Sequence, residues 1–316
     1  MKIGILDDYQ DVALQMADWS SIPGNPEIKV FHDHVAELEP LVQRLLPFDV
    51  LCIMRERTSM SAALLDRLPN LKLIASTGSR NAAIDTEAAK RHGIEVLHTG
   101  YDSTPTIELT WALILAAARN VVAENVSLRS GGWQTTVGAD LHGKTLGVVG
   151  LGNIGSRVAE IGRAFRMNVI AWSQNLTTEK AEASGASLVS KEEIFRNADI
   201  LSIHLILSHR SRGLVGRNEL NLMKPTAYLI NTSRGPIVDE AALIETLKAR
   251  KIAGAAVDVF DLEPLPAEHP FRHLRNVLAT PHIGYASRFL YETFYKDSVA
   301  NIRSWKGADD ARSQQH

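Results

Sequence analysis

Three side chains that could act together on a small anion follow three apolar, strand-like runs of this sequence. Arg234 follows the run AYLI, Glu263 follows AAVDVF, and His282 follows VLAT. A guanidinium binds a carboxylate through two parallel hydrogen bonds, and a histidine beside a glutamate keeps its proton longer and can act as an acid near neutral pH. These residue types predict a site that holds an anion and donates a proton.

Each of the three residues also has an ordinary structural explanation. Arg234 alone suits a surface ion pair, Glu263 a solvated loop acid and His282 a turn residue. Ligands of open parallel sheets bind beyond the carboxyl ends of the strands, where all three residues are expected to lie. Their joint placement therefore favours a functional interpretation.

A glycine-rich turn begins almost halfway along the chain, in the stretch VVGLGNIGSRVAE of residues 148–160. The spacing G-x-G-x-x-G is weak evidence alone, but here it follows the strand-like run LGVV and precedes an amphipathic helical pattern. Gly150 allows a tight turn, Gly152 lets backbone amides approach a pyrophosphate, and Gly155 lets the helix pack on the strand. The context predicts a dinucleotide site.

The expected second strand of that unit ends in AWSQN, where a site that prefers NAD usually carries an acid for the ribose. Ser173, Gln174 and Asn175 stand at that place. No carboxylate there repels a 2′-phosphate, and no arginine there binds one. The cofactor is therefore predicted as NAD or NADP, with a slight preference for tolerance of NADP.

Short apolar runs alternate with helical patterns along the whole chain, which predicts parallel sheets covered by helices. The first hundred residues contain five such runs, KIGIL, IKVF, VLCIM, LKLIAS and IEVL. One long helix is predicted over residues 105–128, and the helical pattern after Pro281 is expected to cross back to the first unit. The second unit is expected to hold six parallel strands: Leu146–Val149, Val169–Ala171, Ile200–Ile203, Ala227–Ile230, Ala255–Val259 and Val277–Ala279.

Composition restricts the kind of protein. With 316 residues, 45% of them hydrophobic, two domains are the natural expectation. A formal charge of −2 without a block of like charge disfavours nucleic acid and anionic membranes as partners. The single cysteine, Cys52, lies in an apolar run and fits a reducing compartment. The first residues do not read as a signal peptide, so a cytoplasmic location is expected.

The motifs GLGNIG, NTSRGPIVDEAAL, AAVDVFDLEPLP and TPHIGY, in this order, closely resemble the D-isomer specific 2-hydroxyacid dehydrogenase family, which includes phosphoglycerate dehydrogenase and glyoxylate/hydroxypyruvate reductase. The resemblance covers nearly the whole chain. It implies an α/β fold with two doubly wound parallel-sheet domains. A Rossmann dinucleotide-binding domain at 104–284 would be inserted in a flavodoxin-like substrate-binding domain made of 1–103 and 285–316.

The same resemblance implies hydride transfer between the nicotinamide and a small 2-oxoacid or D-2-hydroxyacid, in a homodimer. The family's catalytic arginine, glutamate and histidine fall on Arg234, Glu263 and His282, and the first and last of these also contact the substrate. The cofactor-binding positions implied by the motifs and the glycine turn are Gly150, Gly152, Asn153, Ile154, Gly155, Ser173, Gln174, Asn175, His204, Thr232 and the nicotinamide-contacting Asp258.

Two motifs depart from the family pattern. The substrate loop reads GSRNAAID at residues 78–85, which leaves the amides of Ser79 and Arg80 as carboxylate donors. Arg55, in MRERT, and Arg80 are hypothesised to meet a charged distal group of the substrate. In SIHLILS, the family's usual proline is replaced by Ile206, and His204 is interpreted as structural or adjacent to the cofactor.

The sequence bears on three alternative functions. A dinucleotide-sensing, non-catalytic protein similar to transcriptional corepressors retains the same residue types and stays open as an alternative. Formate oxidation is disfavoured, because the formate dehydrogenases of this family generally have glutamine where Glu263 stands. No metal is predicted, because neither the HDH stretch at 32–34 nor the pair His269 and His273 is completed by cysteines or clustered acids, and Pro270 disrupts helical pairing of the latter.

Overall fold

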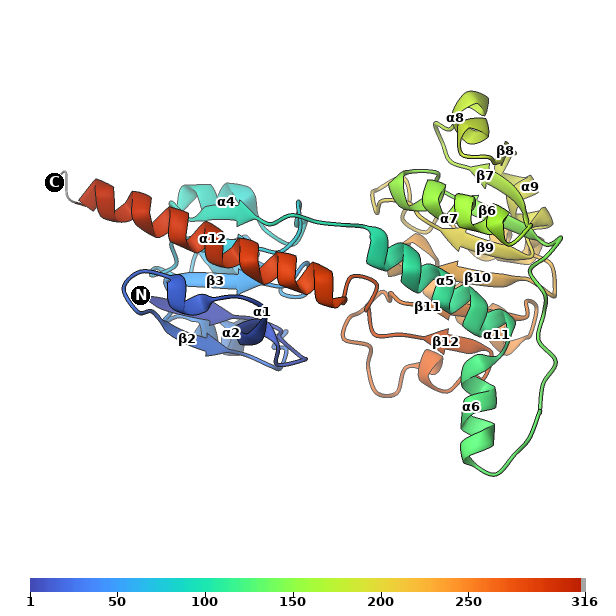
Figure 1. The fold of residues 1–316 in the computed structure, drawn as a ribbon, viewed down its shortest axis with the longest axis horizontal. Helices are drawn as coiled ribbons and strands as arrows, with labels where there is room; N and C mark the ends of the chain where they lie inside the picture. The colour runs from blue at the N-terminus through green and yellow to red at the C-terminus, as the bar shows by residue number, and fades with distance from the viewer. Residues whose placement is uncertain (314–316) are drawn as a thin grey trace. The chain divides into compact units, whose positions relative to one another are not determined.

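Two parallel sheets organise the chain in the computed structural model, which describes residues 1–313 (Figure 1). Unit 1 comprises Met1–Asp102 and the chain from Ser287 onward, and unit 2 comprises Ser103–Ala286. Each unit has its own hydrophobic core, so each is described separately.

Unit 1 contains a five-stranded sheet of order β2-β1-β3-β4-β5, in which every pairing is parallel. The five predicted strands are confirmed: β1 (Lys2–Ile5), β2 (Glu27–Val30), β3 (Val50–Ile53), β4 (Leu73–Ser76) and β5 (Glu95–His98). The helices are α1 (Ala13–Met16), η1 (Trp19–Ser21), α2 (Leu38–Leu45), α3 (Ala62–Leu65), α4 (Thr86–Arg91) and α12 (Arg288–Ser313).

The C-terminal helix α12 belongs to unit 1. Its aromatic residues Tyr291, Phe294 and Tyr295 are buried, whereas Phe289 is exposed. Because residues three or four apart share one face of a helix, these three rings form the face that packs toward the sheet and α1.

Unit 2 contains a seven-stranded parallel sheet of order β12-β11-β10-β9-β6-β7-β8. Its strands are β6 (Thr145–Val149), β7 (Asn168–Trp172), β8 (Ser187–Leu188), β9 (Ile200–Ile203), β10 (Tyr228–Asn231), β11 (Gly254–Val257) and β12 (Val277–Ala279). The prediction of six strands was wrong, because it missed β8. That strand has two residues and pairs only with Ile170 and Ala171 of β7, so it leaves no apolar run in the sequence.

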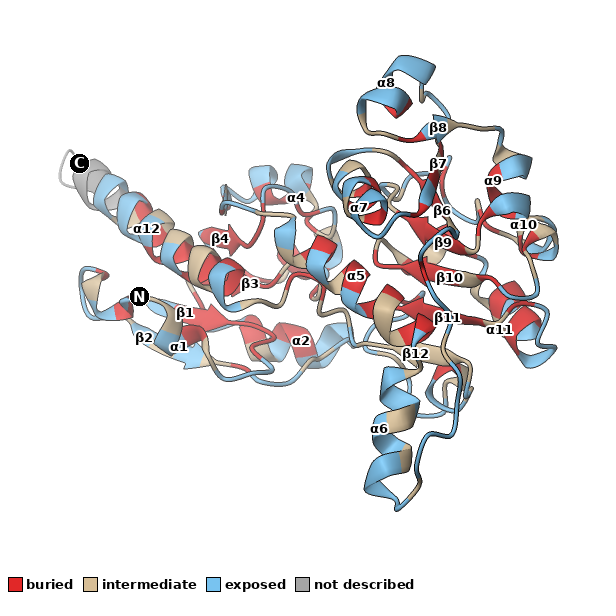
Figure 2. Ribbon diagram, turned by 45° about the vertical axis from the view of Figure 1, so that its right-hand side comes forward, coloured by how far each residue is buried: buried red, intermediate tan, exposed pale blue. Residues whose placement is uncertain are grey.

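The helices of unit 2 are α5 (Thr104–Ala118), α6 (Val121–Arg129), α7 (Asn153–Ala164), α8 (Thr178–Ala183), α9 (Lys191–Asn197), α10 (Arg217–Leu222) and α11 (Glu240–Lys248), with short turns η2 (Gly235–Ile237) and η3 (Pro270–Arg272). The single helix predicted over 105–128 is two helices, because Asn120 adopts the left-handed conformation with φ of 52°. Asparagine tolerates that conformation better than most residues. Helix α5 is largely buried, whereas α6 has no buried residue and is mostly exposed (Figure 2).

No single helix among residues 1–313 has the length and apolarity to cross a membrane, and the bent pair α5–α6 meets that test only when its two helices are counted together.

The strand order places the chemistry-bearing turns of unit 2. All seven strands run in the same direction, so the turns after β6, β7, β9, β10, β11 and β12 share one edge of the sheet. The chain reverses its direction across the sheet between β6 and β9, which makes this edge the expected ligand site of a doubly wound sheet. In unit 1 the same reversal lies between β1 and β3.

Candidate active site

The glycine turn between β6 and α7 is tightly packed at Gly150 and Gly155 and open at Gly152. Gly150 has φ of 98°, and a Cβ on it would lie 2.7 Å from the main-chain oxygen of His204. A Cβ on Gly155 would collide with the main-chain oxygen of Gly150. A Cβ on Gly152, in contrast, would meet no atom within 4 Å, so neither packing nor φ requires glycine there. The absent side chain instead keeps the start of α7 open, which fits a pyrophosphate held by helix amides.

The turn after β7 carries the residues that would face the ribose. Ser173 is partly buried, and Gln174 and Asn175 are exposed. The N–H of Leu176 donates to the main-chain oxygen of Ser173 at 3.1 Å, which closes the turn. The turn offers neutral hydroxyl and amide groups, in agreement with the absence of an acid from the sequence.

His204 lies directly beside the glycine turn. Its N–H donates to the main-chain oxygen of Val149 at 2.8 Å, and its Nε2 lies 2.8 Å from the Ser202 hydroxyl. Burial lowers the pKa of His204 to about 3, so the imidazole stays neutral. The main chain of His204 therefore packs against Gly150, and its imidazole does not supply a proton near neutral pH.

Thr232 and Asn231 fix the turn after β10. The Thr232 hydroxyl lies 2.8 Å from the Thr110 hydroxyl of α5, so its contribution to a ligand would come from the main chain. The Asn231 amide donates to the main-chain oxygen of Arg234 at 3.0 Å, and its oxygen accepts from the N–H of Ser233. These bonds hold the turn that presents Arg234.

The Arg234 turn and the Glu263 loop are packed backbone to backbone. The Nη1 of Arg234 donates to the main-chain oxygen of Ser233 at 2.8 Å. A side chain on the next residue, Gly235, would collide with the main chain of Phe260 and Asp261. The glycine therefore lets the two loops approach more closely than any other residue would permit.

The structure brings Glu263 and His282 together. The Nδ1 of His282 lies 2.5 Å from Oε2 of Glu263, and the other carboxylate oxygen accepts the N–H of Phe260 at 2.9 Å. The imidazole also packs edge to face against Tyr285, with ring centroids 5.4 Å apart. With Nδ1 engaged by the carboxylate, Nε2 is the ring nitrogen available to a substrate.

Asp258 holds the turn that carries His282. One carboxylate oxygen accepts from the Thr280 hydroxyl at 2.6 Å and from the N–H of Ile283 at 2.9 Å, and the other accepts from the N–H of Gly284 at 2.8 Å. Burial raises the pKa of Asp258, and these hydrogen bonds oppose that rise. These three hydrogen bonds, which we call the Asp258 latch, fix the turn. The sequence assigned Asp258 to the nicotinamide and did not indicate the latch, because two of the three donors are main-chain groups, which leave no sequence signal.

The predicted substrate residues outside unit 2 lie at the carboxyl edge of the unit 1 sheet. The guanidinium of Arg55 lies directly against Gly78, with its carbon 5.0 Å from the centroid of the Tyr101 ring. Ser79 and Arg80 are exposed in the turn after β4. Arg55 and the 78–80 turn are therefore neighbours, and Tyr101, which sequence reasoning missed, joins them.

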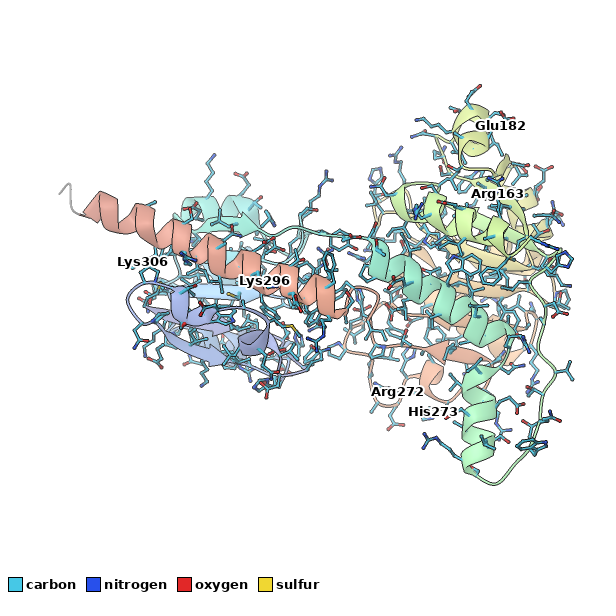
Figure 3. All side chains as sticks on the ribbon, in the orientation of Figure 1. Arg163, Glu182, Arg272, His273, Lys296 and Lys306 are labelled. Atoms are coloured by element: carbon cyan, nitrogen blue, oxygen red, sulfur yellow. The ribbon has the colours of Figure 1, made fainter. Side chains whose placement is uncertain are left out.

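The two histidines of the possible metal pair, His269 and His273, lie in different surroundings. The Nε2 of His269 donates to the Glu240 carboxylate at 2.9 Å, and its Nδ1 accepts the N–H of Phe271, which ties the loop after β11 to α11. His273 is exposed beside Arg272 (Figure 3). Neither arrangement adds a reason to expect a metal.

A different group, Asp8, Asp11 and His32, places one ligand atom each within 4.8 Å of the others. The Asp8 carboxylate already accepts the N–H groups of Val12 and Ala13, at 2.9 Å each. The other two side chains are exposed, so the group carries no metal assignment.

Comparison with known proteins agrees with this geometry. Residues 111–284 match the family described as D-isomer specific 2-hydroxyacid dehydrogenase, NAD binding domain. A glyoxylate reductase from Aeropyrum pernix is 46% identical over 235 residues, which are 71% of this chain and 70% of the relative. A D-3-phosphoglycerate dehydrogenase from Methanocaldococcus jannaschii is 40% identical over 78% of this chain, but the match spans only 47% of that longer relative.

Solved structures extend the likeness to both units. A phosphoglycerate oxidoreductase from Vibrio cholerae has a TM-score of 0.92 at 38% identity, covering 98% of this chain and 99% of that one. An acyclic imino acid reductase solved with NADPH and D-Arg has a TM-score of 0.75 at 27% identity, covering 98% of each chain. The protein is thus an NAD(P)-dependent oxidoreductase acting between small 2-oxoacids and D-2-hydroxyacids, and it belongs to the D-isomer specific 2-hydroxyacid dehydrogenase family.

Proposed function

We propose that Arg234, Glu263 and His282 bind the oxoacid and deliver its proton. The hydrogen bond between Glu263 and His282 is the observation that carries this assignment. Because Nδ1 faces the carboxylate at 2.5 Å, the proton leaves from Nε2 toward the carbonyl oxygen of the substrate. Glu263 stabilises the charge on the imidazole and sets the plane of the ring. In the reverse direction the same nitrogen accepts the hydroxyl proton.

Arg234 is assigned to the substrate carboxylate. A guanidinium offers two parallel N–H groups to a carboxylate, and the charge polarises a carbonyl next to it. Support comes from the close packing of the Arg234 turn on the Phe260–Asp261 main chain, which leads directly to Glu263.

The glycine turn and its surroundings would hold the cofactor. The amides of Asn153, Ile154 and Gly155 at the start of α7 suit the pyrophosphate, and the turn after β7 suits the adenosine ribose. When bound, the reduced dinucleotide supplies the hydride. Neutral Ser173 and Gln174 neither repel nor pair with a 2′-phosphate, so we propose that both NADH and NADPH are used.

Arg55 and Arg80 are proposed to meet a charged distal group of the substrate, such as a phosphate or a second carboxylate. The position of Arg55 against Gly78 and Tyr101 supports this role, because the guanidinium is held beside the loop whose amides would bind an anion. Arg55→Ala and Arg80→Ala are expected to lower kcat/KM for charged oxoacids more than for pyruvate. Unchanged discrimination would remove the proposal.

A homodimer built on unit 2 is also proposed. The α6 helix and the following segment expose large apolar side chains, above all Trp133 at 77% and Val137 at 97%. A hollow of about 440 Å³ on the same unit is lined by Leu115, Leu141 and Phe165 together with Arg119, Asp140 and His142. A second copy of this chain would cover both features in one twofold interface. In analytical ultracentrifugation, the unaltered chain is expected to sediment as a dimer and Trp133→Arg as a monomer.

A cytoplasmic location is proposed from the free, buried thiol of Cys52. Burial raises the pKa of the Cys52 thiol to about 12, and a chain with a single cysteine forms no internal disulfide, which is usual for proteins of a reducing compartment.

The assignment is tested by measuring kcat/KM for a matrix of 2-oxoacids, including glyoxylate, hydroxypyruvate and pyruvate, with each reduced cofactor. Oxidation of the cofactor that depends on the oxoacid is expected. Tight cofactor binding without turnover across the panel would instead favour a dinucleotide sensor.

A further inference from the structure

Ser202 carries a buried hydroxyl that the proposed mechanism does not use. It lies on β9 and is 0% exposed. Its oxygen lies 2.8 Å from Nε2 of His204, and this is its one hydrogen-bonding contact within the part of the chain that the structure describes. Residues two apart on a strand share one face of the sheet, so the contact follows from the strand itself. The pair Ser202–His204 is therefore built into β9 and its end.

The hydrogen atom of this contact belongs to the serine. Burial lowers the pKa of His204 to about 3, so the ring is neutral and carries a single N–H. If Nε2 donated to Ser202, the only hydrogen of the hydroxyl would be buried without an acceptor, which is costly. If Ser202 donates, that hydrogen is used and Nε2 is the acceptor. The imidazole then carries its own hydrogen on Nδ1.

The second ring nitrogen of His204 belongs to the reversal point of the unit 2 sheet. His204 is the first residue after β9, which is the neighbour of β6 in the sheet. Its main-chain oxygen would lie 2.7 Å from a Cβ on Gly150, the first glycine of the turn after β6. His204 is partly exposed, and its Nδ1 has no hydrogen-bond partner among the residues that the structure describes. Ligands of doubly wound sheets bind at this point.

We propose that Ser202 is a positioning residue for the cofactor: its hydroxyl holds His204 in the Nδ1–H form, and that N–H donates to an oxygen of the bound dinucleotide. The inference rests on the proposed placement of the cofactor at the glycine turn. The diphosphate and the nicotinamide-side ribose both present oxygens that accept a hydrogen bond. The experiment distinguishes these two acceptors.

The first measurement is the tautomer of His204 in the cofactor-free chain, by ¹⁵N NMR after histidine-selective labelling at about pH 8, where histidines are mostly neutral. The His204 signals are identified by their loss in His204→Asn. His269 is the internal reference for the opposite form, because its Nε2 donates to Glu240 and its Nδ1 accepts the N–H of Phe271. The Nδ1–H form of His204 is expected, and the Nε2–H form would overturn the proposal.

The second measurement compares cofactor affinity in Ser202 variants. Ser202→Ala removes the donor to Nε2, so the Nε2–H form of His204 should appear. The affinity for NADH, read from nicotinamide fluorescence, should fall about three- to tenfold, as expected for one lost neutral hydrogen bond. Ser202→Thr keeps the hydroxyl and should restore both the tautomer and the affinity. Ser184→Ala removes a hydroxyl that contacts the main chain of Lys180 and should change neither.

Titration with ADP locates the acceptor, because ADP contains a diphosphate but no nicotinamide half. Equal weakening of ADP and NADH binding in Ser202→Ala supports a diphosphate oxygen, and weakening of NADH binding alone supports the nicotinamide half. Unaltered affinity for both ligands, in a variant whose His204 tautomer has changed, would remove the proposed role of Ser202.

The unaltered chain decides the matter if Ser202→Ala does not fold. Saturation with NADH should then shift the Nδ1 signal of His204 and leave that of His269 in place. An unmoved Nδ1 signal would count against the hydrogen bond to the cofactor. Turnover is not part of either measurement, so a chain that binds NADH without reducing any oxoacid would fail the proposed function and leave this inference standing.

Discussion

Replacing Glu263 by glutamine tests how much the carboxylate contributes to proton donation. In Glu263→Gln, the amide oxygen can still accept the N–H of Phe260, so the loop keeps its support. The amide nitrogen then faces Nδ1 of His282 and can only donate to it. A protonated imidazole would place two N–H groups against each other, so the charged form loses its partner.

The size of the effect follows from the bond that is lost. A hydrogen bond to a charged group is worth about 1.5–3 kcal/mol. The His282 and Glu263 side chains are 25% and 34% exposed, so solvent screening places the value in the lower part of that range. At about 1.4 kcal/mol per factor of ten in rate, kcat for oxoacid reduction should fall roughly 10- to 30-fold.

The assay is the steady-state oxidation of NADH or NADPH with glyoxylate, read at the absorbance band of the reduced nicotinamide. Glu240→Gln is the matched control, because Glu240 makes a similar bond to His269 at 2.9 Å next to the same loop and does not contact His282. Cofactor affinity should be unchanged in both variants. Full kcat in Glu263→Gln, or an equal loss in Glu240→Gln, would refute the reasoning.

Three further predictions follow from single residues. Burial lowers the pKa of His204 to about 3, from an ordinary value of 6.5, so below pH 6.5 this histidine binds a proton in the unfolded chain but not in the folded chain. The free energy of unfolding should therefore drop by about 1–2 kcal/mol from pH 7 to pH 5. Urea denaturation of His204→Asn at the two pH values should show a smaller drop. Asp258→Ala leaves the amides of Ile283 and Gly284 without their acceptor and should lower the free energy of unfolding by about 2–4 kcal/mol in the same assay; a loss below experimental error would contradict the latch. Ser173→Asp should shift the ratio of kcat/KM toward NADH by about tenfold or more, since a carboxylate binds the ribose diol and repels a 2′-phosphate; an unshifted ratio would place the ribose elsewhere.

Much of the fold was predictable because buried strands in parallel sheets are continuous apolar runs. All five strands of unit 1 were found in this way, as were six of the seven strands of unit 2. The exceptions have local causes. β8 is too short to leave a pattern, and the break between α5 and α6 depends on one left-handed residue, Asn120, inside a sequence whose apolar pattern continues.

The candidate site was predictable to the level of residue types and edges. Because parallel strands end at one edge, the turns that carry Arg234, Glu263 and His282 had to be neighbours, and the Glu263–His282 bond follows from that placement. The Asp258 latch did not, since main-chain donors carry no residue identity.

The most direct measurement of the central claim is the turnover of His282→Ala beside that of the unaltered chain, with saturating reduced cofactor and the best oxoacid of the panel. Loss of general acid catalysis is expected to lower kcat by about 10²- to 10⁴-fold while the cofactor binds as before, and the unaltered chain should form the D-2-hydroxyacid. An unchanged kcat in His282→Ala would contradict the account.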